Sequence, residues 1–158
     1  MIDYRSTYDV LVVGAGHAGY EAALAASRMG AKTALVTIEM DAIGRMSCNP
    51  SVGGIGKSHL VCDLDGLGGE IAKNADYTGI QFRTLNTKKG PVVQAHRVQC
   101  DKEFFPKRIR AILEKEPNLN IVQTLVSEIW IENGSLRGVK VEDGSEISAK
   151  TVVIATGT

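Results

Sequence analysis

The sequence predicts an α/β fold built on a parallel, doubly wound sheet, and three observations carry this prediction. Residues 8–13 form an apolar run that leads directly into a glycine-rich turn. An alanine-rich stretch with high helix propensity follows over residues 20–29, and a second apolar run occupies 32–37. This order makes one βαβ unit, whose strands lie parallel in a sheet. We expect Gly30 to end the helix.

Composition limits the class of protein but does not identify a partner. The chain has 158 residues, 44% of them hydrophobic, which is enough for one globular core. Its 18 basic and 18 acidic residues cancel. The three cysteines are odd in number and widely spaced, which favours a reducing compartment over a disulfide framework or a zinc site. With no apolar run long enough to span a bilayer, we expect a cytoplasmic protein without a membrane or metal partner.

Residues 40–100 differ in composition from the first βαβ unit. They are rich in Gly, Asn, Pro and Ser, and their helical spacing predicts one helix, from about Lys57 to Asn74. A connection this long predicts a functional glycine-rich insertion. An amphipathic helix over Asp101–Lys115 follows it and ends before Pro117.

The last part of the chain predicts a series of short strands, over residues 120–126, 128–132, 136–142, 145–148 and 151–155. Asn133-Gly134 predicts a hairpin turn of type I′, and Asp143-Gly144 predicts a second turn of the same kind. The final strand is apolar and ends in Ala155-Thr156-Gly157. The middle strands therefore predict a three-stranded crossover inside the larger fold.

The glycine-rich turn has the spacing GxGxxG, with Gly14, Gly16 and Gly19. Between a strand and a helix this spacing is a dinucleotide-binding fingerprint. Its first glycine permits the tight turn, the second admits a pyrophosphate, and the third allows the helix to pack closely on the strand. The helix N-terminus then attracts the anion. The pattern predicts a Rossmann-like FAD/NAD(P)-binding domain, and a tight turn without a ligand is the alternative.

An acidic residue at the tip of the second strand usually binds the ribose hydroxyls in such a domain. By counting, Thr37 occupies that position, and Glu39 lies two residues later on the same face if the strand extends so far. Glu39 is therefore a candidate ribose ligand, with a solvated surface charge as the alternative.

FAD is favoured over NAD by the later elements. The long insertion, the three-stranded crossover and a closing strand that ends in Ala-Thr-Gly resemble the FAD domain of the glutathione-reductase-like flavoproteins, in which this last tripeptide lies close to FAD. The resemblance adds Thr156 and Gly157 to the candidate cofactor-binding residues.

Residues 47–61, SCNPSVGGIGKSHLV, raise the alternative of an NTPase. A P-loop requires glycine five positions before Gly56, where this chain has Ser51, and no apolar strand leads directly into the run. We therefore reject a P-loop. Successive glycine N–H groups and Lys57 still make this run a candidate for contact with phosphate or flavin.

Several motifs together closely resemble the MnmG (GidA) family of tRNA uridine 5-carboxymethylaminomethyl modification enzymes. They are the run 47–61 together with residues 65–69, 79–83, 85–86 and 89–91, the turn 14–19, Arg97, Gln99, Asp101 and the terminal Gly157-Thr158. The related folate-dependent tRNA methyltransferases share the GxGxxG but not the run 47–61. The resemblance covers the whole chain.

This resemblance implies a cytoplasmic, homodimeric FAD enzyme that works with a GTPase partner similar to MnmE. Together they add an aminomethyl or carboxymethylaminomethyl group to C5 of the tRNA wobble uridine, with methylene-tetrahydrofolate as carbon donor and NADH as a reductant of the flavin. The FAD contacts of the family correspond here to Gly14, Ala15, Gly16, His17, Ala18, Gly19 and Val126.

Family members are several times longer, so residues 1–158 correspond to the N-terminal part of the FAD-binding domain, without the other family domains. We therefore do not expect this chain to turn over alone. Two alternatives are a catalytically inert nucleotide-binding module and another FAD-dependent oxidoreductase that acts on a small molecule.

The resemblance also makes Cys48 a candidate nucleophile toward uridine C6, or a thiol next to the flavin, since nearby N–H groups and Lys57 favour a thiolate. An inert thiol is the alternative. Cys62 is expected in the core, and Cys100 is ambiguous. His17 is expected to be neutral at the start of the helix.

Positive charge concentrates between Arg83 and Lys115, where nine Lys or Arg stand against three acids, a net charge of +6. We call residues 83–115 the basic segment. It predicts contact with the tRNA backbone, or a solvated helix face and loop tip. Arg97 and Lys102 are alternatively candidates for a flavin phosphate or folate.

Overall fold

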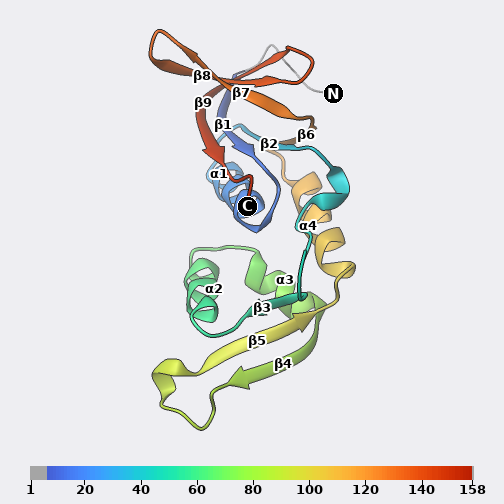
Figure 1. Cartoon of the computed structure of the whole chain (residues 1–158), viewed down its shortest axis with the longest axis vertical. Helices are drawn as coiled ribbons and strands as arrows, with labels where there is room; N and C mark the ends of the chain where they lie inside the picture. The colour runs from blue at the N-terminus through green and yellow to red at the C-terminus, as the bar shows by residue number, and fades with distance from the viewer. Residues whose placement is uncertain (1–6, 158) are drawn as a thin grey trace. The chain divides into compact units, whose positions relative to one another are not determined.

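The computed structural model describes residues 7–157, and they divide into two compact units. The first unit lies within Met1–Gly44 and Arg110–Thr158, and the second comprises Arg45–Ile109. Each unit has a sheet of its own (Figure 1).

The first unit is built on a six-stranded sheet in the order β6-β2-β1-β9-β8-β7. Four of these strands are parallel neighbours: β6 (Leu119–Gln123), β2 (Thr33–Thr37), β1 (Tyr8–Val13) and β9 (Glu146–Ile154). The other two pair antiparallel at the far edge: β8 (Ser135–Val141) and β7 (Val126–Glu132). The parallel part confirms the predicted fold class.

Burial explains the central strands. Every residue of β2 is buried, which suits a parallel strand covered on both faces. Tyr8 and Leu11 of β1 and Val36 of β2 belong to the apolar core of this unit. Helix α1 (His17–Arg28) packs against β1 and β2 and contributes Tyr20 and Leu24 to the buried residues.

Helix α1 ends as predicted at Gly30, which has a φ of +90°. The N–H of Gly30 donates to the carbonyl of Ser27 at 2.9 Å, and the N–H of Ala31 donates to Ala26 at 3.1 Å. These two bonds form a Schellman motif, which requires a left-handed residue. The helix begins at His17, three residues before the expected start.

The two predicted hairpins differ in their turns. Asn133 and Gly134 both have positive φ, 50° and 72°, so the first turn is of type I′ as predicted. At the second turn only Gly144 has positive φ, and its N–H donates to Val141. The prediction of a second type I′ turn is therefore wrong, because the side chain of Asp143 instead accepts the N–H of Ser145.

The strands predicted over 145–148 and 151–155 are one strand, β9. Its first part pairs with β8 up to Ser148, and its second part pairs with β1 from Ala149 onward. No turn residue interrupts it, so the strand continues while it changes partner. The strand predicted over 120–126 ends at Gln123, and Val126 begins β7.

The second unit holds a three-stranded antiparallel sheet, in the order β3-β5-β4, that was not predicted from the sequence. Its strands are β3 (Ser51–Gly53), β5 (Ala95–Cys100) and β4 (Gly79–Leu85). Helices α2 (Lys57–Gly66) and α3 (Ile71–Thr78) pack against β3 and β5. Residues 7–157 also contain two short 3₁₀ helices, η1 (Met40–Ala42) in the first unit and η2 (Pro91–Val93) in the second.

The single helix predicted over residues 57–74 is wrong, because α2 and α3 are separate. Gly68 has a φ of +92° and donates to Asp65, while Gly69 donates to Leu64. This is a second Schellman motif, and it ends α2.

Helix α4 (Phe104–Lys115) buries Phe105, Ile109 and Leu113 completely, as its amphipathic pattern predicted. It begins three residues after Asp101, the expected start. In the part of the chain that the structure describes, no helix has both the length and the apolar character needed to cross a membrane.

Candidate functional site

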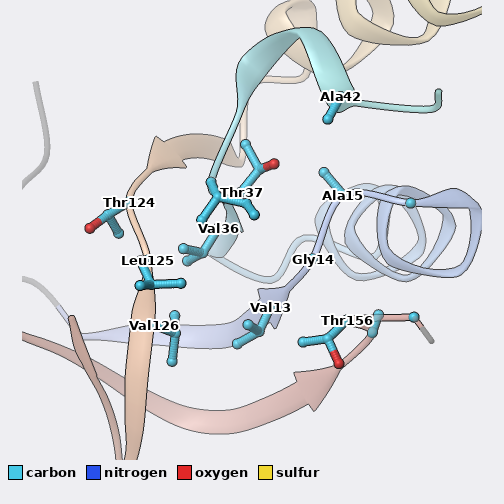
Figure 2. A pocket seen from close by; sticks show the side chains of 14 residues that line it. Val13, Gly14, Ala15, Val36, Thr37, Ala42, Thr124, Leu125, Val126 and Thr156 are labelled. Atoms are coloured by element: carbon cyan, nitrogen blue, oxygen red, sulfur yellow. The ribbon is translucent and has the colours of Figure 1, made fainter. Parts of the chain in front are cut away.

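A cavity of about 400 Å³ lies in the first unit, at the carboxyl ends of β1, β2 and β9. Doubly wound sheets bind their ligands at this edge. The lining comes from three places in the chain, which Figure 2 shows around one space: the ends of β1 and β2 with the turns that follow them, the connection from β6 into β7, and the residues after β9. Its volume lies in the lower part of the range for ligand pockets.

The first glycine of the turn is required by the fold. Gly14 has a φ of +100°, and a Cβ there would overlap the carbonyl group of Ala155. Its N–H donates to the carbonyl of Val36 at 2.8 Å, while Ala155 donates to Val13 at 2.8 Å. The turn is therefore fixed between the ends of β2 and β9, where a side chain has no room.

The third glycine is also required by the fold. A Cβ at Gly19 would overlap the carbonyl oxygen of Gly14 and lie 3.5 Å from the Cβ of Ala155. The first turn of α1 therefore packs directly on the backbone of the strand and its turn, as the GxGxxG spacing predicts.

The second glycine has no such role in the fold. Gly16 is exposed, has an ordinary φ of −69°, and a Cβ there would meet nothing within 4 Å. It is the N-cap of α1 and lines the cavity. Space beside a helix N-terminus that the fold does not use is what a bound anion requires.

The helix N-terminus supplies the electrostatics of the cavity. The N–H of Tyr20 donates to Gly16 at 3.0 Å, so the N–H groups of Ala18 and Gly19 precede the first bond within the helix. No acidic residue lies in the first turn. Burial lowers the pKa of His17 below its ordinary value of 6.5, so the imidazole is neutral at pH 7 and leaves the helix dipole as the local positive charge.

The opposite wall is apolar. Figure 2 shows Val13, Val36, Leu125 and Val126 around the cavity, between the glycine turn and the start of β7. A flat, apolar ring such as a purine base suits this wall. Thr156 and Gly157 complete the lining on the side of β9.

The cavity brings together some of the predicted cofactor-binding residues and not others. Its lining includes Gly14, Ala15, Gly16, Val126, Thr156 and Gly157. His17, Ala18 and Gly19 are not in the lining and lie in the first turn of α1. Glu39 is exposed at the N-cap of η1, where its carbonyl accepts the hydroxyl of Thr37 at 3.1 Å. It lies outside the lining, and β2 ends at Thr37, so the strand face that Glu39 was expected to share with Thr37 does not extend to it.

About half of the lining was not among the predicted cofactor-binding residues. These residues lie at strand ends or in the segments that follow: Val13, Val36, Thr37, Ile38, Ala42, Thr124, Leu125 and Ala155. Thr37 had been placed only at the position of the ribose ligand, and Ala155 only within the Ala-Thr-Gly tripeptide. The rule that ligands bind at the carboxyl edge of parallel strands was the signal for Val13, Val36 and Thr37. Leu125 and its neighbours could be predicted as lining residues only if the end of β6 was known. The sequence analysis placed that end at residue 126, three residues too late.

The family model described as glucose inhibited division protein A matches residues 9–158 of this chain. The chain belongs to the GidA family. The match includes the glycine turn, the second unit and the closing strand, so it covers both compact units.

Curated GidA relatives are similar over the whole chain. The tRNA uridine 5-carboxymethylaminomethyl modification enzyme MnmG of Pelobacter propionicus is 54% identical over 158 residues, and that of Geobacter sulfurreducens is 52% identical. Each alignment covers 100% of this chain and 25% of the relative. The chain therefore spans about a quarter of the length of the curated relatives it matches.

Solved structures agree with the fold. Aquifex aeolicus GidA, in its form II crystal, superposes with a TM-score of 0.93 at 49% identity, covering 96% of this chain and 25% of that one. The GidA-related protein from Thermus thermophilus superposes with a TM-score of 0.59 at 20% identity, over 96% of this chain and 54% of that one, and shows the fold alone. The predicted Rossmann-like fold class is confirmed.

The cysteines of the GidA chain lie in the second unit. Cys48 is exposed and lines a cavity of about 430 Å³ together with Lys57. Cys62 is exposed on α2, so the prediction of a core position is wrong. Cys100 is buried, and burial raises the pKa of its thiol, which keeps it protonated. Among the described residues, no three metal-ligating side chains gather at one place.

Part of the positive charge of the basic segment is neutralised by acidic neighbours. Lys107 pairs with Glu103, and Arg108 pairs with Glu70. Arg110 pairs with both Asp41 and Glu114. Glu103 and Glu114 are already counted in the net charge of the segment, but Glu70 and Asp41 lie outside it. The net charge therefore overstates what Arg108 and Arg110 offer to a polyanion.

Proposed function

We propose that this GidA chain binds FAD in the cavity at the carboxyl edge of the first sheet. The observation that carries the proposal is Gly16, whose missing side chain leaves space at a helix N-terminus although the fold does not need it. The turn 14–19 would hold the pyrophosphate, and the apolar wall that includes Val126 would hold the adenine. Bound FAD supplies two-electron redox chemistry, and the residues of this chain bind and orient it.

We propose further that the longer protein modifies tRNA. With a GTPase partner similar to MnmE, it would add an aminomethyl or carboxymethylaminomethyl group to C5 of the wobble uridine. Methylene-tetrahydrofolate would supply the carbon, NADH would reduce the flavin, and the protein would act as a homodimer in the cytoplasm. The support is identity of 52–54% to enzymes named for this modification.

Within that reaction we propose Cys48 as the thiol closest to the chemistry. It is exposed, and it lines a cavity that Lys57 also lines, so its sulfur is open to a substrate. Glu39 stays a proposed ribose ligand, and the basic segment a proposed contact for tRNA.

The visible absorption spectrum of the purified chain tests the cofactor. After incubation with FAD and removal of free flavin, we expect a bound-flavin band close to one FAD per chain. Gly16→Asp puts a negative charge where the pyrophosphate would lie and should weaken binding at least tenfold. Gly90→Asp is the matched control, because Gly90 also has an ordinary φ and open space, but lies in the second unit. A colourless wild-type chain would overturn the proposal.

Modification of tRNA tests the role of Cys48. The full-length enzyme with Cys48→Ser would be expressed in a strain without its own enzyme, and the wobble uridine would be analysed by mass spectrometry. We expect no modified nucleoside, while Cys62→Ser, an exposed cysteine on α2, should restore it. Modification that survives Cys48→Ser removes the nucleophile from the proposal and leaves FAD binding untouched.

A further inference from the structure

A second site lies on the three-stranded sheet of the second unit. Gln81, Arg83, Leu85, Arg97 and Gln99 line a cavity of about 230 Å³. The antiparallel register sets Arg83 directly opposite Arg97 and Gln81 opposite Gln99. Because side chains alternate along a strand, these residues share one face of the sheet, while Val52 and Val98 share the other face.

The pairing of Arg83 with Arg97 is unfavourable by itself. Directly opposed side chains lie close enough to interact, and like charges in that arrangement destabilise a sheet. Among residues 7–157, neither guanidinium forms an ion pair with a carboxylate, and no acidic residue lines the cavity. The two arginines therefore lie side by side with no carboxylate to neutralise them. A bound anion would supply the negative charge that this arrangement lacks.

The adjoining cavity of about 430 Å³ extends this charge. This cavity shares Leu85 and Arg97 with the cavity of about 230 Å³, and its lining adds Lys57, the first residue of α2. No acidic residue lines it either. In register with Arg97 lies Gly53, whose φ is +86° and where a Cβ would overlap the carbonyl of His96. The backbone is therefore held close to the arginine. Three cations and no carboxylate border the two cavities.

We propose that this face binds a phosphate group, with Arg83 and Arg97 as its principal ligands. The planar guanidinium group of arginine can donate two parallel hydrogen bonds to the oxygens of a phosphate. Two guanidinium groups from neighbouring strands also neutralise the negative charge of a phosphate dianion, which one arginine would neutralise only in part. The side-chain amides of Gln81 and Gln99 add neutral donors on the same face. Lys57 adds a point charge from the adjoining cavity. The site stands on the second unit alone and does not depend on FAD binding in the first.

Inorganic phosphate is the first probe. Titration of the FAD-free chain, followed by ³¹P NMR, should show saturable binding that Arg83→Gln and Arg97→Gln each weaken at least tenfold. Arg83→Lys should not restore it, because lysine lacks the planar guanidinium group. Lys73→Gln is the control, an exposed lysine of α3 that removes the same charge from the same unit.

Thermal unfolding separates this role from a structural one. Removing one of two opposed like charges should leave the Tm of Arg83→Gln and Arg97→Gln unchanged or slightly higher. A lower Tm for both variants would mean that the pair supports the sheet, and would overturn the proposal.

Two further probes identify the source of the phosphate. If it belongs to an RNA backbone, each arginine variant should weaken binding of a short RNA stem-loop and reduce the slope of log K against log salt by about one. If it belongs to a free phosphorylated molecule, AMP binding should fall while RNA binding is unchanged. The site would be refuted if Arg97→Gln bound phosphate, AMP and RNA as tightly as wild type does. It would also be refuted if none of these three probes bound the wild-type chain.

Discussion

At the scale of single residues, the GxGxxG turn separates the requirements of the fold from those of a ligand. Gly14 and Gly19 lack side chains because backbone atoms occupy the space, whereas the space beside Gly16 is open. A fold that needed only a tight turn would not need the second glycine. The open position is thus the feature of the turn that the proposed binding of an anion explains.

Paired glycine substitutions test this distinction. Gly19→Ala drives a Cβ into the carbonyl oxygen of Gly14, which is backbone and cannot rotate away, so we expect a loss of about 1–3 kcal/mol of unfolding free energy. Gly16→Ala should change stability by no more than about 0.5 kcal/mol. Urea unfolding measures both values, and equal effects of the two variants would contradict the assignment of roles.

The glycine turn could be predicted from the sequence because its function depends on fixed spacing within six residues. Val126 could be placed only through a family resemblance, since it lies far along the chain from that turn. The position of Glu39 depended on where β2 ends, and element ends are set by local hydrogen bonds that periodicity does not show.

At the scale of elements, helix α4 depends on a cap that also makes its stability depend on pH. The side chain of Asp101 accepts the N–H groups of Phe104 at 2.8 Å and Glu103 at 2.9 Å. These bonds lower the pKa of its carboxyl below the ordinary value of 3.8. The folded state therefore favours the carboxylate more than the unfolded state does.

We expect Asp101→Ala to lower the urea midpoint at neutral pH, because the helix loses its cap. The difference from wild type should be full above the ordinary pKa of 3.8 and shrink as pH falls through the lower pKa of the folded state. Asp101→Asn keeps a capping oxygen and should lose less at neutral pH. Because asparagine does not ionise, the urea midpoint of Asp101→Asn should lack the pH dependence that Asp101 contributes in the wild type. A difference in midpoint between Asp101→Ala and wild type that stays constant as pH falls to the acid limit of the folded state would contradict the cap.

A buried polar network joins α3 to the part of α4 in the second unit. The side chain of Asn74 is fully buried, donates to the carbonyl of Phe105 at 3.0 Å and accepts from Arg108 at 3.0 Å. Arg108 also pairs with Glu70 and lies over the ring of Tyr77. The network is satisfied within the unit, so it explains why these polar side chains are buried.

Asn74→Ala leaves the carbonyl of Phe105 and the guanidinium of Arg108 without these partners. We expect a loss of about 1–3 kcal/mol in the unfolding free energy, measured in urea. Lys73→Ala changes the neighbouring exposed residue of the same helix and should cost no more than about 0.5 kcal/mol. A loss for Asn74→Ala as small as that of the control would show that the network is dispensable.

The elements of the second unit show the limit of periodicity. Strand β3 has three residues, too few for an alternating pattern to be recognised, and β4 is mostly exposed. Leu67 continues the helical spacing of the apolar residues beyond the last residue of α2. The hydrophobic period therefore does not show that the helix ends before Gly68. The helix over 101–115 and the first hairpin were predictable because an amphipathic face and an Asn-Gly turn are local signals.

At the scale of the whole molecule, the chain has two compact units, and the candidate FAD cavity belongs to one of them. Units with separate cores tend to open as separate cooperative units. Hydrogen exchange followed by mass spectrometry should therefore show that Gly19→Ala speeds exchange within 7–44 and 110–157. Asn74→Ala should speed it within 45–109. Faster exchange across the whole chain in both variants would mean that the units unfold together.

Binding of the FAD pyrophosphate by the turn 14–19 underlies the proposed function of this chain. A crystal structure of the chain grown with FAD is its decisive test. We expect phosphate density beside Gly16 at the N-terminus of α1, with the adenine against Val36 and Val126. Density for the dinucleotide at another place, or a cavity closed by its own side chains in crystals that contain FAD, would refute this binding mode.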